Sequence, residues 1–251
     1  MNYKFNMSKI VILSDIHGNL TALNSVLLDI EKREIGNYYY AFLGDNINYG
    51  LRSNEVISIL ASIPKTKIFA NIRGNHEDAI ENYPKGKFST KRGEEALKFT
   101  KDKLTKDSFL FIKHELSKSF LEINYLGRKI LFVHGNLNDP LWGSMNHSEM
   151  LSLEYKKYDF VFSGHTHKPQ YNEMFYKDIK SKNRGEKKTI FINPGSVGQP
   201  RNHNPRAHYM IVDILTEECH FHKVPYNIKE ECIIFNNEID KFYINRLNKG
   251  I

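Results

Sequence analysis

Two residues that can bind a metal ion, Asp15 and His17, directly follow the four aliphatic residues 10–13. Such an apolar run predicts a strand that is buried on both faces. Because alternate residues of an extended chain share a face, the carboxylate and the imidazole can point the same way just beyond the strand. Gly18 then permits a tight turn, and Asn19 can cap the helix that follows. The pair predicts the start of a metal site, although a capping aspartate and an incidental histidine would give the same pattern.

Polar residues also follow four other predicted strands. They are Asp45 after strand 38–43, Asn75 and His76 after strand 67–70, His134 after strand 129–133, and His165 and His167 after strand 160–162. Each cluster alone has an ordinary explanation as a turn or as a hydrogen-bonded histidine. If one sheet brings these strand ends together, they provide two carboxylates, one amide oxygen and four imidazoles, with His76 left over. Such mixed donors favour Mn, Fe, Co, Ni or Zn, and two ions could share a carboxylate.

The elements that must position these residues begin with a strand, a helix, a strand, a helix and a strand. The helices are predicted over 20–30, where apolar residues recur at helical spacing, and over 53–63, which Pro64 ends. This order favours a parallel sheet with helices on its faces. Residues 78–116 are expected to be helical and rich in loops.

Four hairpin strands and two helices are predicted in the second half of the chain. The strands are 119–124, 129–133, 209–214 and 219–224, and the helices are 228–235 and 239–247. A turn at Leu126 and Gly127 joins the first two strands. A further strand at 188–192 leads into a loop that is dense in glycine and proline. The chain has no repeat and no linker, so one domain over residues 1–251 is expected.

Composition restricts the class of protein. The 251 residues are 40% hydrophobic and 26% charged, as in an ordinary globular enzyme or scaffold. Without a membrane-length apolar run or a signal-peptide pattern, the protein is expected to be cytoplasmic. Cys219 and Cys232 form no Cys-x-x-Cys pair, so neither a disulfide framework nor a thiolate zinc site is expected. The net charge of +7 comes from scattered lysines, and their densest cluster, at 177–188, reads as a solvated hairpin loop. This pattern argues against nucleic-acid binding as the main role.

Five short motifs occur in order along the chain: Asp-x-His, Gly-Asp, Gly-Asn-His-Glu, His-Gly and Gly-His-Thr-His. This series resembles the calcineurin-like metallophosphoesterase superfamily. The Asn-Pro-Gly-Ser-Val-Gly-Gln-Pro-Arg loop at 193–201 and the Val-Pro-Tyr at 224–226 are similar to a bacterial and archaeal branch of stand-alone phosphoesterases. The motifs span residues 15–226, nearly the whole chain. The resemblance implies a four-layer α/β fold, α-β-β-α, in which two mixed sheets lie face to face between helices, instead of one parallel sheet.

The resemblance also implies a role for each clustered residue. One metal ion would be bound by Asp15, His17 and His167, a second by Asn75, His134 and His165, and Asp45 would bridge them. His76 would donate a hydrogen bond or a proton to the phosphoryl or leaving-group oxygen, which a departing alkoxide requires. The expected cofactors are two divalent ions, with Mn as first choice and Fe, Co, Ni or Zn as alternatives.

Four positions depart from the family pattern or have two interpretations. Tyr49 stands where phosphoprotein phosphatases carry an arginine that grips phosphate, which weakens a protein-phosphatase or diadenosine-tetraphosphatase activity. Asn136 stands where a serine is common after His-Gly. Arg201 is the candidate phosphate clamp, and a surface arginine paired with a carboxylate is the alternative. Trp142 could stack a base or pack within its loop.

The resemblance therefore implies a dinuclear metal-dependent phosphoesterase that hydrolyses phosphate monoesters or diesters, with nucleotide-type substrates among the candidates. A hydroxide held between the ions would attack phosphorus while His76 assists the leaving group. A non-catalytic scaffold with the same fold is the main alternative, and the complete set of ligands opposes it. A nuclease is a third hypothesis, but no room for added DNA-binding segments is expected after Ile251. The sequence decides neither the physiological substrate, nor the native metals, nor the oligomeric state.

Overall fold

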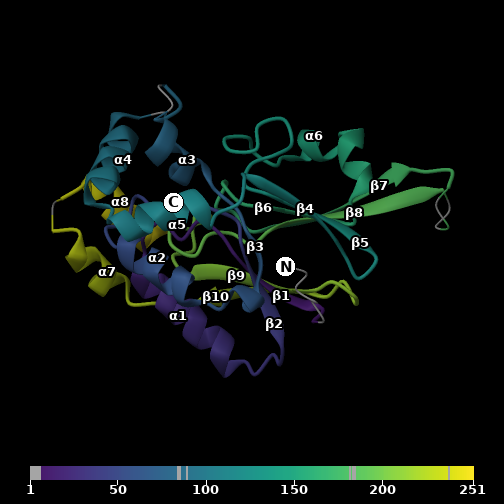
Figure 1. Cartoon of the computed structure of the whole chain (residues 1–251), viewed down its shortest axis with the longest axis horizontal. Helices are drawn as coiled ribbons and strands as arrows, with labels where there is room; N and C mark the ends of the chain where they lie inside the picture. The colour runs from purple at the N-terminus through teal and green to yellow at the C-terminus, as the bar shows by residue number, and fades with distance from the viewer. Residues whose placement is uncertain (1–6, 84–85, 89, 181, 183–184, 237) are drawn as a thin grey trace.

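Ten strands form two sheets in the part of the chain that the computed structural model describes, residues 7–83, 86–88, 90–180, 182, 185–236 and 238–251 (Figure 1). The strand order is β10-β9-β1-β2-β3 in the first sheet and β4-β5-β6-β8-β7 in the second. The strands are β1 (Lys9–Leu13), β2 (Tyr38–Phe42), β3 (Ile68–Asn71), β4 (Phe120–Tyr125), β5 (Arg128–Val133), β6 (Phe160–Ser163), β7 (Gln170–Lys177), β8 (Glu186–Asn193), β9 (Ala207–Asp213) and β10 (Cys219–Val224). Both sheets are mixed, as the resemblance implied, and the expectation of one parallel sheet was wrong.

The first sheet is built around β1, whose aliphatic residues are buried as predicted. β1 pairs in parallel with β2, where Lys9 lies opposite Tyr38, and antiparallel with β9, where Lys9 lies opposite Asp213. β3 continues the parallel side and β10 the antiparallel side. Beyond β1, the Asn19 side chain accepts a hydrogen bond from the Ala22 N–H at 3.0 Å, so the predicted helix cap is confirmed. The carboxyl ends of β1, β2 and β3 therefore lie at one edge.

The second sheet has a parallel centre and antiparallel edges. β5, β6 and β8 are parallel, whereas β4 and β7 pair antiparallel with their neighbours. The hairpin at Leu126 and Gly127 is confirmed by the pairing of β4 with β5. β7 was not predicted, because most residues of this edge strand are exposed or only half-buried and so give no buried apolar run. The hairpin expected at 177–188 joins β7 to β8, and its residues 181, 183 and 184 lie outside the described part of the chain.

The two sheets pack face to face around a core of buried side chains. Alternate residues of β1 divide between two layers. Ile10 and Ile12 face the second sheet, whereas Val11 and Leu13 pack against helices on the other face. The second sheet contributes aromatic rings to the shared core, namely Phe132, Phe160 and Phe162. Each such aliphatic or aromatic side chain stabilises the fold by about 1.5–3 kcal/mol when fully buried. This core fixes the two sheets relative to each other and so positions the loops at their edges.

Helices complete the outer layers. They are α1 (Leu20–Lys32), α2 (Ser53–Ser62), α3 (Asn75–Asn82), α4 (Lys91–Lys103), α5 (Lys106–His114), α6 (His147–Met150), α7 (Ile228–Ile234) and α8 (Lys241–Lys249), with short 3₁₀ turns η1 (Lys65–Lys67) and η2 (Leu153–Lys157). α1 and α2 cover the first sheet, and α6 and η2 cover the second. Figure 1 shows α3, α4, α5 and α8 grouped at the left, opposite the extended β7–β8 hairpin. None of the described helices has the length and apolar character needed to cross a membrane.

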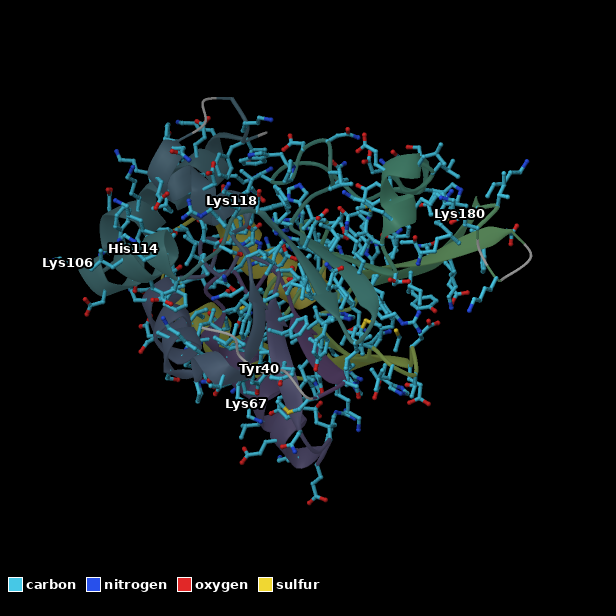
Figure 2. The ribbon with its side chains drawn as sticks, turned by 45° about the vertical axis from the view of Figure 1, so that its right-hand side comes forward. Tyr40, Lys67, Lys106, His114, Lys118 and Lys180 are labelled. Atoms are coloured by element: carbon cyan, nitrogen blue, oxygen red, sulfur yellow. The ribbon has the colours of Figure 1, made fainter. Side chains whose placement is uncertain are left out.

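Surface lysines are spread over separate parts of the molecule. Figure 2 shows Lys67, Lys106, Lys118 and Lys180 far apart from one another. Lys67 belongs to η1 and Lys106 begins α5, whereas Lys118 precedes β4 and Lys180 follows β7. These four positive charges therefore do not form a common stripe, which agrees with the scattered lysines of the sequence.

Candidate metal centre

The two sheets present the carboxyl ends of parallel strands at the same edge, where the predicted polar clusters lie. Asp15 and His17 follow β1, Asp45 follows β2, Asn75 begins α3 beyond β3, His134 follows β5, and His165 and His167 follow β6. The ring of His134 crosses between the sheets, since its Nδ1 donates to the main-chain oxygen of Leu43 at 2.7 Å. The structure thus brings all seven predicted metal-ligand residues into one site.

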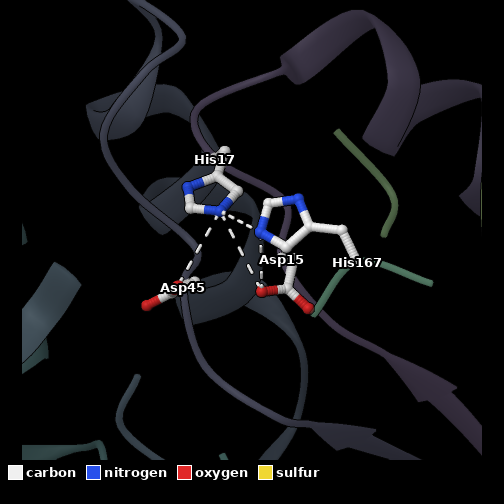
Figure 3. Close-up of side chains that lie close together, drawn as sticks. All are labelled: Asp15, His17, Asp45 and His167. Carbon is white, nitrogen blue, oxygen red and sulfur yellow. Dashed lines mark hydrogen bonds and ion pairs between the residues drawn. The ribbon is translucent and has the colours of Figure 1, made fainter. Parts of the chain in front are cut away.

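The first group of candidate ligands contains Asp15, His17, Asp45 and His167 (Figure 3). Each offers one ligand atom, and the four atoms lie within 4.8 Å of one another. The Nε2 atoms of His17 and His167 are 3.1 Å apart. Asp15 Oδ1 is 3.3 Å from His167 Nε2, and Asp45 Oδ2 is 3.8 Å from His17 Nε2. Two imidazole nitrogens and two carboxylate oxygens therefore converge on one point.

The second group contains Asp45, His134 and His165, whose ligand atoms also lie within 4.8 Å of one another. Asp45 Oδ2 is 3.2 Å from His134 Nε2. The amide oxygen of Asn75 lies 3.0 Å from His134 Nε2 and 3.0 Å from His165 Nδ1, so it faces the same point. Asp45 is common to the two groups, as a bridging carboxylate must be.

Three histidines are oriented by hydrogen bonds on the side of the ring that faces away from the centre. The Nδ1 atoms of His17, His134 and His167 lie 3.1, 2.7 and 2.6 Å from main-chain oxygens. An oxygen acceptor at Nδ1 holds the proton there and leaves the Nε2 lone pair free to bind a metal ion. In addition, Asp15 Oδ1 is buried and has no hydrogen-bond partner in the described residues. Such an orphaned carboxylate oxygen among free imidazole nitrogens fits a bound cation.

The main chain is strained at the same residues. Five of them, none of them glycine, have positive φ angles: Asp15 (53°), His17 (49°), Asp45 (54°), His165 (65°) and His167 (58°). The left-handed region is unfavourable for such residues and is found where the surrounding structure enforces it. Here the loops after β1 and β2 are joined by hydrogen bonds from His17 N to Asp45 O and from Gly18 N to Asn46 O, both 2.9 Å. The strain is thus held by the packing of two loops against each other.

His76 lies beside both ligand groups and belongs to neither. Its Nδ1 is 2.6 Å from the Asn48 amide, and its Nε2 is 3.9 Å from Asp45 Oδ2. The Asn48 oxygen already accepts hydrogen bonds from the Tyr49 N–H at 2.7 Å and the Thr100 hydroxyl at 3.1 Å. The Asn48 nitrogen therefore donates to His76 Nδ1, which places the His76 proton on Nε2. His76 thus presents an N–H group toward the centre.

Burial and charge separate the pKa values of these groups. Burial raises the pKa of Asp15 to about 7. Burial also opposes the charge on Asp45, but His134 and His76 outweigh it and hold the Asp45 pKa well below its ordinary value. Burial lowers the pKa of His134, but the Asp45 carboxylate outweighs burial and raises it to about 9. Burial lowers the pKa of the other histidines: His17, His76, His165 and His167. These four imidazoles are therefore neutral at pH 7, the form that can bind a metal ion.

Comparison with known proteins identifies the family. A family model described as the calcineurin-like phosphoesterase superfamily domain matches residues 8–217, most of the chain. The matched stretch contains every motif from Asp15 to Arg201. The chain belongs to the calcineurin-like phosphoesterase superfamily. It is therefore a metal-dependent phosphoric ester hydrolase, as the resemblance implied.

The chain is similar to bacterial and archaeal proteins over most of its length. An uncharacterized protein of Methanocaldococcus jannaschii is 30% identical over 226 residues, which cover 89% of this chain and 90% of that protein. The crystal structure of a metallophosphoesterase from Sphaerobacter thermophilus is 26% identical, with a TM-score of 0.74 over 98% of this chain and 100% of the other. A hypothetical protein from Pyrococcus horikoshii OT3, 22% identical, shares the fold, with a TM-score of 0.78 over 98% of this chain and 99% of the other.

Tyr49, which departs from the phosphoesterase pattern, and Arg201, the candidate phosphate clamp, lie together. Tyr49 contacts the centre directly, since its ring centroid is 4.7 Å from that of His17 and 4.6 Å from that of His76. Arg201 is half-buried and lies near Tyr49, where its positive charge opposes the rise in the Tyr49 pKa that burial causes. It forms no ion pair among the described residues, and its Nε is buried without a partner. The surface ion pair considered for Arg201 therefore does not occur in the described part of the chain.

Asn136 and Trp142 belong to one loop of the phosphoesterase. The Asn136 side chain accepts from the Asp139 N–H at 2.8 Å and donates to the Ser144 main-chain oxygen at 3.3 Å. It thereby shapes the loop that carries Trp142. The Trp142 ring is 5.2 Å from that of Phe88, which in turn is 5.4 Å from that of His76. Trp142 thus packs in its loop and also forms part of an aromatic wall beside the centre.

Glu77 supports the centre, although no role was predicted for it beyond its place in Gly-Asn-His-Glu. Its carboxylate is fully buried and accepts hydrogen bonds from main-chain N–H groups of Gly74 (2.8 Å), Asp45 (2.8 Å) and Asn46 (2.6 Å). The carboxylate thus joins the start of α3 to the loop that carries Asp45. A glutamate at the third position of a helix is a recognisable capping signal, but its bonds to a loop some thirty residues earlier could not be foreseen.

Replacing Glu77 by Gln is expected to lower the free energy of unfolding by about 3 kcal/mol, because a neutral amide cannot accept from N–H groups at both of its ends. Urea denaturation measures this loss. Glu95→Gln, which alters an exposed glutamate of α4, is the matched control and should stay within about 0.5 kcal/mol of the wild type. Equal stability of the two variants would show that Glu77 does not hold the Asp45 loop.

Proposed function

We propose that this phosphoesterase binds two divalent cations and hydrolyses phosphate monoesters or diesters. The first cation is held by Asp15, His17 and His167, the second by Asn75, His134 and His165, and Asp45 is shared. The observation that carries the proposal is the membership of Asp45 in both ligand groups. The mixture of imidazole nitrogen and carboxylate or amide oxygen favours Mn, with Fe, Co, Ni or Zn as alternatives.

Bound in this centre, the cations supply Lewis-acid chemistry that activates the attacking water and neutralises the phosphoryl oxygens. The chain itself provides the proton for the leaving group. Because Asn48 donates to Nδ1 of His76, the opposite nitrogen carries its proton toward the centre and can donate to the departing oxygen. Arg201, which has no carboxylate partner in the described residues, provides positive charge for the phosphate.

The surroundings of His76 support a nucleotide-type leaving group. The Phe88 and Trp142 rings form an aromatic wall that extends from His76 toward His165, whose ring centroid is 6.4 Å from that of Trp142. A flat ring such as a nucleobase can stack on such a wall. His165, whose ring lies beside that of Trp142, is half-buried and therefore partly exposed to solvent. The wall therefore lies where the part of the substrate beyond the departing oxygen would extend.

The function is tested by hydrolysis of p-nitrophenyl phosphate and bis(p-nitrophenyl) phosphate. Turnover is expected with added Mn²⁺, to be lost in EDTA and to return when Mn²⁺ is restored. A nucleoside monophosphate and a cyclic nucleotide added to the panel separate monoesters from diesters. No metal-dependent turnover of any phosphoester would contradict the proposal and favour a non-catalytic scaffold.

Metal binding is expected to release protons and to become tighter as the pH rises from 6 to 9. Asp15, with a pKa of about 7, and His134, with a pKa of about 9, are protonated at the acidic end of this range. Both must lose their protons to bind a cation, so protons compete with metal until the pH exceeds the higher pKa. Calorimetric titration of Mn²⁺ into EDTA-treated and dialysed protein, in buffers of different ionisation enthalpy, should detect about one to two protons released per protein at pH 7. An affinity that does not change between pH 6 and 9 would contradict this expectation.

The lysines are scattered along the sequence, which argues against nucleic-acid binding as the main role. We propose a small phosphoester as the partner. Salt-sensitive binding to DNA would overturn this part of the proposal. The single domain over residues 1–251 and the cytoplasmic location stay predictions from the sequence.

A further inference from the structure

The helix α8 reaches the candidate metal centre through a stack of tyrosines. The ring of Tyr243 lies 4.8 Å from that of Tyr49, with an angle of 25° between the ring planes. Tyr49 in turn contacts the rings of His17 and His76. Tyr49 therefore docks α8 beside the centre. Any positive charge at this side of the centre must come from other elements.

Two arginines supply that charge from different parts of the chain. Arg246 lies one turn after Tyr243 on α8, and its Cζ is 6.0 Å from the centroid of the Tyr49 ring. Arg201, from the loop before β9, lies near the same tyrosine, and its positive charge opposes the rise in the Tyr49 pKa that burial causes. The loop and the helix are tied together, since the N–H of His203 donates to the main-chain oxygen of Gly250 at 2.7 Å. The contact between the loop and the helix thus holds both guanidinium groups near Tyr49.

Neither guanidinium group is paired with a side-chain carboxylate in the described part of the chain. Among the described residues, Arg201 and Arg246 form no ion pair with a side-chain carboxylate, unlike Arg33, Arg52, Arg73 and Arg128. Arg246 Nε donates to the Ile251 main-chain oxygen at 2.7 Å, whereas Arg201 Nε is buried without a partner. Burial and the nearby Arg201 lower the pKa of Arg246 to about 10. Two partly buried guanidinium groups that are near each other and lack a side-chain carboxylate partner favour a bound anion.

We propose that Arg201 and Arg246 form an anion subsite that binds a second phosphate group of the substrate, next to the phosphate group that is hydrolysed. The inference rests on the proposed phosphoesterase function and names its substrate class, nucleotide-type esters with two or more phosphate groups. The reacting phosphate already has the cation ligands and His76 around it. Tyr49 contacts His17 and His76, and Arg246 contacts Tyr49. Arg246 is therefore further from the candidate ligands than Tyr49 is. Planar guanidinium groups bind phosphate oxygens in pairs, which suits this outer position.

The first test measures binding without catalysis. Inorganic pyrophosphate and inorganic phosphate are titrated calorimetrically into the full-length protein in EDTA, so that metal ions play no part. Pyrophosphate should bind to the wild type, and Arg246→Gln and Arg201→Gln should each weaken that binding about tenfold or more, because each removes a charged hydrogen-bond donor. Arg206→Gln, which alters an exposed arginine of the same loop, should bind pyrophosphate as the wild type does. Unchanged binding in both Arg201→Gln and Arg246→Gln would overturn the subsite.

The second test compares AMP and ADP as competitors of p-nitrophenyl phosphate hydrolysis at a constant concentration of free Mn²⁺. ADP should inhibit the wild type about tenfold more strongly than AMP, and Arg246→Gln should remove most of that difference. Arg246→Lys, which keeps the charge but loses the planar fork, should give an intermediate ratio, and Arg206→Gln should keep the wild-type ratio. A wild-type enzyme that hydrolyses p-nitrophenyl phosphate but does not distinguish ADP from AMP would overturn the subsite and leave the proposed function intact. Absence of turnover together with arginine-dependent binding of pyrophosphate would overturn the proposed function and support the subsite.

Discussion

Asparagine in place of Asp45 is expected to leave a folded protein that binds fewer than two Mn²⁺ ions and hydrolyses p-nitrophenyl phosphate about a thousandfold more slowly. Asp45 Oδ2 lies 3.8 Å from His17 Nε2 in one ligand group and 3.2 Å from His134 Nε2 in the other. The substitution therefore removes an anionic ligand from both groups at once. Losing several kcal/mol of charge stabilisation in the transition state corresponds to this fall in rate.

The same substitution should preserve the local fold. Asp45 Oδ1 accepts a hydrogen bond from the main-chain N–H of His76 at 2.9 Å, and the amide oxygen of asparagine can accept the same bond. The main-chain N–H of residue 45 still donates to Glu77. Metal content measured by plasma mass spectrometry after dialysis, together with thermal unfolding, separates lost ligation from misfolding. Asp102→Asn, on the exposed side of α4, is the control and should bind two ions. An Asp45→Asn variant with two ions and wild-type turnover would show that the carboxylate is not shared.

Much of the centre was visible in the sequence because its residues follow buried strands. An uninterrupted aliphatic run such as residues 10–13 locates a strand, and chain direction then places Asp15 and His17 at its carboxyl end. The antiparallel pairing of β1 with β9 could not be read in the same way, because it joins segments some two hundred residues apart. The division into two sheets became visible through the family resemblance and the hairpins. Local pattern thus located the candidate ligands, and tertiary pairing decided how they meet.

The supporting residues could not be found from the sequence, because their roles depend on what lies across a loop or a sheet. The helix that carries Arg246 was predicted, but nothing in its spacing indicates that it ends beside Tyr49. The role of Asn48 depends on two contacts that the sequence does not show: its amide oxygen accepts from the Thr100 hydroxyl, and its amide nitrogen faces His76 Nδ1. The left-handed backbone at the candidate ligands could not be predicted either, because none of these residues is a glycine. Functional strain of this kind breaks the local rules on which prediction depends.

Alanine in place of His76 is expected to slow hydrolysis in proportion to the basicity of the leaving group. The His76 proton is placed on Nε2 because Asn48 donates to Nδ1, and that N–H faces the centre 3.9 Å from Asp45 Oδ2. Phenolate is a poor leaving group and needs this proton, so turnover of phenyl phosphate should fall about a thousandfold, within the usual range for a general acid. p-Nitrophenolate is stable as an anion and should depart with a loss of only about tenfold.

The ratio of the two rates distinguishes proton donation from a structural role. His76 lies outside both ligand groups, so Mn²⁺ stoichiometry in His76→Ala should equal that of the wild type. His114→Ala, which alters an exposed histidine at the end of α5, should leave both rates unchanged. If the His76→Ala variant lost the two activities equally, His76 would position the phosphate or the Asp45 loop and would not supply the proton. Unequal loss with both ions retained ties the geometry of Asn48 and His76 to protonation of the leaving group.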